Sequence, residues 1–268
     1  MGNNKIAILG GGNLGAAIAV GLVKAKLSKA ADITVTRRHL SKLAALKTAG
    51  FKTTTSNEEA VKLSGIIIIC VQPKQVKALM DEIGKRLDEK KHILVSTVTG
   101  VTTEEIAGQL NKKIPIVRSM PNTAIAIGAS MTCLCSMNAS DSQLAVIRKL
   151  FDGLGKTMII EERLMKAATV LAASGVAFFM RYIRAATQGG IQLGFDAEEA
   201  QLIAVQTAKG GASLLLENHS HPEIEIDKVT TPEGCTIAGL NQMEHEGMSS
   251  ALIKGILTSF EKINTIKK

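Results

Sequence analysis

The feature that most constrains the fold is an apolar segment near the N-terminus that runs directly into a glycine-rich turn. Residues 5–9 are mostly apolar and predict a buried strand, and Gly10-x-Gly12-x-x-Gly15 follows at once. The next residues predict a helix, because Leu14, Ile18 and Leu22 recur every four positions and share one helix face. A strand, a glycine turn and a helix in this order are typical of a dinucleotide-binding unit.

Each glycine of this motif has a separate mechanical role in such a unit. Gly10 permits the tight turn, Gly12 lets a pyrophosphate approach the backbone, and Gly15 lets the helix pack close to the strand. The free amides at the start of the helix would hold the phosphate charge. The motif therefore predicts cofactor binding.

Length, composition and charge exclude several other classes of protein. The chain has 268 residues, enough for two domains, and 46% of them are hydrophobic, which argues against disorder. No apolar run reaches the roughly 18 residues that cross a bilayer, and no secretory signal is visible, so we expect a cytoplasmic protein with no membrane partner. The net charge of +8 is scattered and aromatic residues make up 3%, so we expect small anionic substrates rather than nucleic acid.

The cysteine and histidine residues give no sign of a metal site. Cys70, Cys133 and Cys135 lie in apolar stretches and are expected in the core. His219-x-His221 stands beside a proline in a predicted loop, and we interpret the two histidines as a chance surface pair rather than as metal ligands. We therefore expect no bound metal.

The end of the second predicted strand indicates which nicotinamide cofactor binds. Residues 33–36 form this strand, and Thr36, Arg37 and Arg38 stand where NAD-selective folds usually carry Asp or Glu. A carboxylate would repel a 2′-phosphate, whereas an arginine can pair with it. We therefore predict that NADPH is preferred and that NADH remains possible, the alternative being that the two arginines are ordinary surface residues.

The segments that follow predict a doubly wound α/β domain. Residues 66–71 form a continuous apolar run, as in a strand buried on both faces, and Val71 and Gln72 would lie at its carboxyl end, the edge where such sheets bind ligands. Further strands are predicted at 93–96, 116–118, 129–135 and 157–160, alternating with helices, to give roughly eight strands. We assign residues 1–161 to a Rossmann-like dinucleotide-binding domain.

Residues 162–268 predict a second domain made only of helices. Helices are expected over 167–191, from Asp196 to about 216, and from about 249 onwards, with residues 217–231 expected to be a polar loop. A helical domain of about a hundred residues cannot bury all its apolar faces by itself. We therefore expect it to pack against a second copy of the chain, in a homodimer or larger homo-oligomer.

Five motifs together resemble the pyrroline-5-carboxylate reductase family over essentially the whole chain. They are Gly10–Gly15, Val71-Gln72-Pro73, Arg118–Thr123, Ala173-Ser174-Gly175 and Thr231-Pro232-Glu233-Gly234-Cys235-Thr236-Ile237. The resemblance implies an oxidoreductase of proline biosynthesis, which reduces the cyclic imine 1-pyrroline-5-carboxylate to L-proline with NAD(P)H. It also implies a Rossmann domain followed by a helical substrate-binding and dimerisation domain.

The same resemblance assigns roles to particular residues. Those implied to bind the cofactor are Gly10, Gly12, Asn13, Leu14, Gly15, Thr36, Arg37, Asn57, Val71, Gln72, Val98 and Asn122. Those implied to contact the substrate are Gly234, Cys235, Thr236, Ser174 and Glu162. Thr236 is the expected catalytic residue: its hydroxyl is a poor acid, so we expect it to position the imine nitrogen by hydrogen bonding. The competing interpretation of Thr236 is a helix N-cap.

The chain departs from the family pattern at three positions. Val176 stands where the family usually has Pro, Glu233 where it usually has Gly, and Gln72 where many relatives have Lys. Two other functions therefore stay open at this stage. One is another Rossmann-plus-helical oxidoreductase of the β-hydroxyacid dehydrogenase kind, and the other is a non-catalytic nucleotide-binding regulator.

Overall fold

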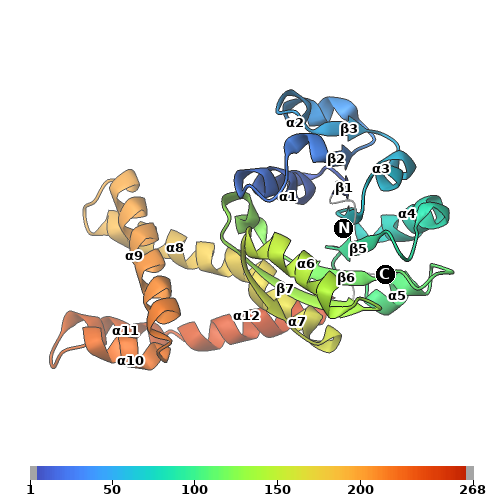
Figure 1. Cartoon of the computed structure of the whole chain (residues 1–268). Coiled ribbons are helices and arrows are strands. Elements are labelled where there is room, and N and C mark those ends of the chain that lie inside the picture. The colour runs from blue at the N-terminus through green and yellow to red at the C-terminus, as the bar shows by residue number, and fades with distance from the viewer. Residues whose placement is uncertain (1–4, 264–268) are drawn as a thin grey trace. The chain divides into compact units, whose positions relative to one another are not determined.

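The computed structural model describes residues 5–263 and divides them into two compact units (Figure 1). The first unit comprises residues 5–174 together with 260–263, and the second comprises Gly175–Ser259. The boundary expected at 161/162 falls where the last strand of the sheet gives way to the first helical turn. That boundary stays a prediction.

An eight-stranded sheet forms the centre of the first unit. Its order is β3-β2-β1-β4-β5-β6-β7-β8, and neighbouring strands are parallel except for the antiparallel pair β6 and β7. The predicted Rossmann-like, doubly wound architecture is confirmed. The strands are β1 (Ile6–Leu9), β2 (Ile33–Thr36), β3 (Lys52–Thr54), β4 (Ile66–Ile69), β5 (Ile93–Ser96), β6 (Ile116–Met120), β7 (Ser130–Met137) and β8 (Gly155–Ile159).

Helices cover both faces of the sheet, as Figure 1 shows. One face packs against α1 (Asn13–Lys24), α2 (Ala44–Thr48) and α6 (Asp141–Asp152), and the other packs against α3 (Asn57–Leu63), α4 (Val76–Ile83) and α5 (Thr103–Ala107). Ile6 and Ile8 belong to the first core, whereas Ala7 and Leu9 belong to the second, because successive side chains of a strand point to opposite faces. Both faces of β1 and β4 are therefore buried, which explains their unbroken apolar sequence.

Short 3₁₀ turns complete the connections of this unit. They are η1 (Ala30–Asp32), η2 (Leu40–Leu43), η3 (Pro73–Gln75), η4 (Gly84–Arg86), η5 (Thr123–Ile127) and η6 (Glu162–Leu164). Side chains cap several helix starts: the Ser56 hydroxyl accepts from the Glu59 amide at 3.2 Å, and Thr102 forms a capping box with Glu105 before α5. These caps fix where α3 and α5 leave the sheet edge.

The predicted long helix over 167–191 is present but is not a uniform α-helix. It begins as α7 (Met165–Ala168), widens into the π-helical segment η7 (Thr169–Ser174), and continues as α8 (Gly175–Gln192). Such π-segments interrupt the regular hydrogen-bond ladder and are frequent at functional sites. In this chain η7 contains Ser174 and ends at the boundary between the two units.

The second unit contains α8, α9 (Ala197–Asn218), α10 (Pro222–Val229), α11 (Cys235–His245) and most of α12 (Met248–Ile263). Helix α9 starts at the expected place, where the Asp196 side chain forms a capping box with Glu199. Large apolar side chains are exposed along these helices, among them Leu193 at 83% and Leu202 at 70%. The helical content confirms the prediction for this part of the chain, and the apolar surface has the character of an association surface.

The expected polar loop over 217–231 is wrong, because residues 222–229 form helix α10. Pro222 occupies the first helical turn, where its missing N–H costs nothing, and the His221 Nδ1 atom accepts from the Glu223 amide at 3.3 Å. The acidic Glu223 and Glu225 lie in the first turn and complement the helix dipole. A proline that suggested a loop is therefore a helix start.

Candidate active site

The glycine turn has the shape that a dinucleotide pyrophosphate requires. Gly10 has φ +109°, and a Cβ there would lie 2.6 Å from the Cys70 carbonyl oxygen. A Cβ on Gly15 would overlap the Gly10 carbonyl oxygen, whereas a Cβ on Gly12 would meet nothing within 4 Å. Gly10 and Gly15 therefore allow close packing, and the space over Gly12 is left open for a ligand.

Hydrogen bonds hold this turn against β2 and leave the start of α1 facing outward. The Gly11 amide donates to the Thr36 carbonyl at 2.7 Å, and the Gly12 amide donates to the Gly10 carbonyl at 2.8 Å. Gly12 is the N-cap of α1, and it provides no side chain to cap the first amides of the helix, which include those of Asn13 and Leu14. These amides and the helix dipole suit a phosphate group, so the turn fits the cofactor that the sequence predicts.

Thr36 and Arg37, expected at the 2′-phosphate end, and Asn57, expected near the adenosine ribose, lie beside the turn. The Thr36 hydroxyl accepts from the Gly10 amide at 3.3 Å and donates to Asn57 Oδ1 at 2.6 Å. Arg37 Nη1 donates to the Gly11 carbonyl oxygen at 2.7 Å, which uses one of five guanidinium N–H donors. The sequence did not reveal Glu82, whose Oε2 accepts from Asn57 Nδ2 at 3.0 Å and so orients that carboxamide.

Val71 and Gln72 follow β4, as expected, and lie in a turn closed by Gln75. The Gln72 amide donates to Gln75 Oε1 at 3.1 Å, and the Gln75 amide donates back to the Gln72 carbonyl at 2.9 Å. Beside this turn, burial raises the pKa of the Cys70 thiol to about 12, although a hydrogen bond from Thr97 opposes the shift. The thiol therefore stays neutral and is expected to be unreactive.

Val98 and Asn122, the residues expected towards the nicotinamide, are both buried. Val98 follows β5, and its amide donates to the Ser96 hydroxyl at 3.3 Å. Asn122 follows β6, and its carboxamide links two segments: Nδ2 donates to the Ala172 carbonyl of η7 at 3.0 Å, while Oδ1 accepts from the Ala124 amide at 2.9 Å. The cofactor residues named from the sequence thus share one edge of the sheet with the glycine turn.

Glu162 lies in the first unit, at the start of η6, and it contacts polar side chains of three elements. Its Oε1 accepts from Arg118 Nη1 of β6 at 2.5 Å, and its Oε2 accepts from the Thr103 hydroxyl of α5 and the Cys135 thiol of β7. Burial and the adjacent carboxylate raise the pKa of Cys135, so its thiol remains a donor. No pattern in the sequence indicates these partners.

Ser174 lies in the first unit, at the end of η7. Gly234, Cys235 and Thr236 lie in the second unit, at the cap and in the first turn of α11. Gly234 is the N-cap of α11, and its amide donates to the Thr231 carbonyl at 3.0 Å. Cys235 and Thr236 are exposed and occupy the first two helical positions, so the Thr236 hydroxyl is not the helix cap. Glu233, just before the cap, has a left-handed backbone with φ +60°.

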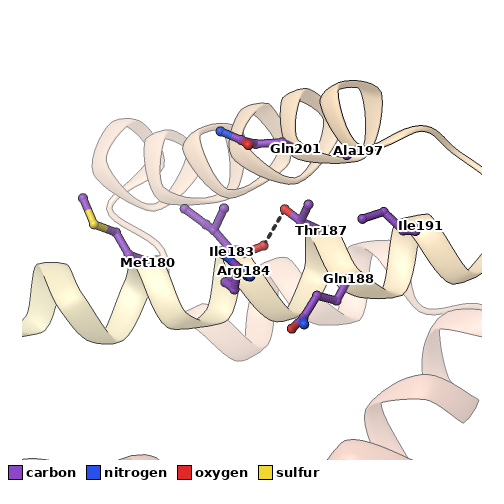
Figure 2. Close-up of a pocket in the computed structure, with 8 residues that line it drawn as sticks. All are labelled: Met180, Ile183, Arg184, Thr187, Gln188, Ile191, Ala197 and Gln201. Atoms are coloured by element: carbon purple, nitrogen blue, oxygen red, sulfur yellow. Dashed lines mark hydrogen bonds between the residues drawn. The ribbon is translucent and has the colours of Figure 1, made fainter.

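A separate hollow of about 520 Å³ lies between α8 and α9 (Figure 2). Ile183 and Ile191 give it apolar walls, and Arg184 and Gln201 add polar groups. Thr187, which the picture shows in the same wall, donates its hydroxyl to the Ile183 carbonyl of its own helix at 2.9 Å. This hollow contains none of the residues that the sequence assigned to cofactor or substrate.

The fold and the glycine-turn edge define a class of protein: a Rossmann oxidoreductase with a helical second domain. Two family models match, "NADP oxidoreductase coenzyme F420-dependent" over residues 5–100 and "Pyrroline-5-carboxylate reductase dimerisation" over residues 162–266. Pyrroline-5-carboxylate reductase 2 of Dictyostelium discoideum is 48% identical over 97% of this chain and 92% of its own length. The chain belongs to the pyrroline-5-carboxylate reductase family.

Other relatives agree with this assignment. Pyrroline-5-carboxylate reductase 1 of Dictyostelium discoideum is 52% identical over 97% of this chain, which spans 49% of that protein's length. A solved pyrroline-5-carboxylate reductase from Coxiella burnetii superimposes with a TM-score of 0.91, at 28% identity and with 99% of each chain covered. The Plasmodium falciparum structure, described as having NADP bound, shares the fold with a TM-score of 0.90 at 22% identity, over 100% of both chains.

Proposed function

We propose that this chain is a pyrroline-5-carboxylate reductase, which forms L-proline from 1-pyrroline-5-carboxylate in the last step of proline biosynthesis. The observation that carries the proposal is the 48% identity to a curated reductase of this name over nearly the full length of both chains. The family membership also disfavours the β-hydroxyacid dehydrogenase alternative. The intact glycine turn and the Gly234-Cys235-Thr236 start of α11 argue against a non-catalytic regulator.

The proposed cofactor is NADPH, whose nicotinamide supplies the hydride when it is bound. Gly12, Asn13 and Leu14 would hold the pyrophosphate at the start of α1. Thr36 and Arg37 would bind the 2′-phosphate end, and Asn57 would lie near the adenosine ribose. The absence of a carboxylate at residues 36–38 leaves no group there that repels the phosphate. NADH is the expected poorer substitute, because it has no 2′-phosphate for Arg37 to pair with.

The proposed substrate residues are Gly234, Cys235 and Thr236, with Ser174 as a further contact. Backbone amides at the start of α11 would receive the substrate carboxylate, because a helix N-terminus favours negative charge. The Thr236 hydroxyl would hydrogen-bond the imine nitrogen and hold it in place as the carbon accepts the hydride. Most of the acceleration would then come from holding the two reacting carbons at a near-attack distance.

The proposed assembly is a homodimer or larger homo-oligomer of a soluble, cytoplasmic protein. Within residues 5–263, one helical stretch, Glu162–Gln192, is long and apolar enough to span a membrane by length and composition, and 17% of its apolar 18-residue window is buried. This stretch begins the matched dimerisation region, which supports contact with a second copy of the chain rather than with lipid. The hollow between α8 and α9 is part of the same region.

The test is consumption of NADPH, followed at 340 nm, with 1-pyrroline-5-carboxylate as the substrate. We expect turnover by the wild type, a large loss of kcat/KM in Thr236→Val, and retention in Thr236→Ser, which keeps the hydroxyl. Tight NADPH binding without turnover by the wild type would support the regulator instead. Normal turnover by Thr236→Val would remove Thr236 from the mechanism while leaving the assigned reaction intact.

A further inference from the structure

Arg118, in the middle of β6, is a buried cation whose ion pair is made across the fold. Its side chain is 2% exposed, and Nη1 donates to Glu162 Oε1 at 2.5 Å. Its Nε and Nη2 atoms are buried without a hydrogen-bond partner in the described part of the chain. A buried guanidinium with unused donors depends strongly on the single carboxylate that faces it.

The second oxygen of Glu162 is also occupied. Oε2 accepts from Thr103 Oγ1 at 3.1 Å and from Cys135 Sγ at 2.9 Å. Thr103 is the first residue of α5, directly after the loop that carries Val98, and Arg118 lies on β6, the strand that ends at the segment carrying Asn122. The one carboxylate therefore joins the two loops expected to flank the nicotinamide.

A second hydrogen bond attaches residues 162–174, the segment that begins with Glu162, to the edge of the sheet where the nicotinamide is expected. Asn122 Nδ2 donates to the Ala172 carbonyl at 3.0 Å, within the π-helical segment η7. Residues 162–174 are thus attached to the nicotinamide side of the Rossmann unit near both ends, through Glu162 and through Ala172. Displacement of Glu162 would loosen Thr103 and Arg118 together.

We propose that Glu162 is a positioning residue for hydride transfer, which acts through Arg118 and Thr103 to fix the Val98 and Asn122 loops. This inference rests on the proposed function and differs from the substrate contact that the sequence suggested for Glu162. Its carboxylate accepts hydrogen bonds from protein donors of three elements, and it orders the loops that hold the nicotinamide at the required distance. Small errors in that distance lower the rate of the chemical step far more than they weaken binding.

The first experiment compares Glu162→Gln with Glu161→Gln. The control removes the same charge one residue earlier, from an exposed carboxylate paired with Arg163 at the surface. We expect Glu162→Gln to lower kcat by about 10- to 100-fold, with a raised isotope effect from 4-deuterated NADPH, and to leave the NADPH Kd and the substrate KM nearly unchanged. Glu161→Gln should behave as the wild type. An unchanged kcat in Glu162→Gln, or a loss confined to the substrate KM, would overturn the inference.

A second variant separates positioning from simple stabilisation. Arg118→Met combined with Glu162→Met removes both charges and keeps side chains of similar length, a change that often restores stability. We expect its Tm to approach that of the wild type while kcat stays low. Recovery of kcat together with Tm would show a merely structural role. If the wild type and Glu161→Gln both fail to turn over the substrate, the proposed function falls and this inference with it. If both are active and Glu162→Gln is as fast as they are, the inference falls alone.

Discussion

Glu233 provides the sharpest test of how the turn before α11 is built. Its φ of +60° places a side chain in the left-handed region, where a Cβ raises the energy by about 1–2 kcal/mol. Glycine relieves this strain but loses about 0.5–1 kcal/mol more entropy on folding. We therefore expect Glu233→Gly to stabilise the folded protein by about 0.5–1 kcal/mol, or roughly 1–4 °C in Tm for a chain of this size.

The measurement is thermal unfolding at one fixed protein concentration, because association contributes to the apparent Tm. Glu233→Ala is the matched control: it removes the same carboxylate and keeps the Cβ that causes the strain. We expect Glu233→Gly to melt at a higher temperature than both the wild type and Glu233→Ala. Equal Tm values for the glycine and alanine variants would refute the backbone explanation.

The same pair of variants also separates backbone strain from charge. Glu233 lies two residues before Cys235, in the turn proposed to receive an anionic substrate. Both substitutions remove a negative charge, so both should lower the KM for 1-pyrroline-5-carboxylate, whereas only the glycine variant should gain stability. A lower KM in one variant alone would contradict the electrostatic part of this reasoning.

Three further perturbations test other parts of the molecule. Gly15→Ala should abolish NADPH binding and destabilise the fold by about 1–3 kcal/mol, because the new Cβ would overlap the Gly10 carbonyl oxygen. Fluorescence titration with NADPH measures the binding, and thermal unfolding measures the stability. Arg37→Asp should raise the KM for NADPH by about 10- to 100-fold and change that for NADH little, with the exposed Arg38→Asp as control; parallel shifts for both cofactors would exclude a 2′-phosphate contact. Burial lowers the pKa of His92 below its ordinary 6.5, so the unfolded chain takes up the proton first and stability falls as pH drops through 6.5. His92→Gln should therefore flatten the dependence of Tm on pH between about pH 5 and 7, and an unchanged slope would contradict it.

Local patterns were sufficient to predict most of the first unit. The apolar run at residues 66–71 predicts the strand β4, and the recurrence of Leu14, Ile18 and Leu22 predicts the helix α1, because these features depend on residues close in the sequence. The glycine turn likewise predicts its own geometry. Helix α10 was missed because Pro222 is equally at home in a loop and in a first helical turn.

Contacts between distant residues could not be predicted in the same way. Arg118 and Glu162 are separated by 44 residues, and their pairing depends on the position of β6 in the sheet and on where η6 begins. Glu82 reaches Asn57 from α4, across 25 residues. The residues next to Arg118, Glu162 and Glu82 in the sequence do not indicate which distant group each will contact, so these contacts became visible only with the fold.

The single antiparallel pair in the described sheet has a consequence for the order of folding. Met120 of β6 pairs with Cys133 of β7 across a short connection, whereas Ile6 of β1 pairs with Ile66 of β4 only after a long excursion of the chain. Short loops close at a smaller entropic cost and faster than long ones. We therefore expect the segment that carries Asn122 to reach its native shape early. We expect the glycine turn to gain its support from β4 later, because the pairing of β1 with β4 closes a longer loop.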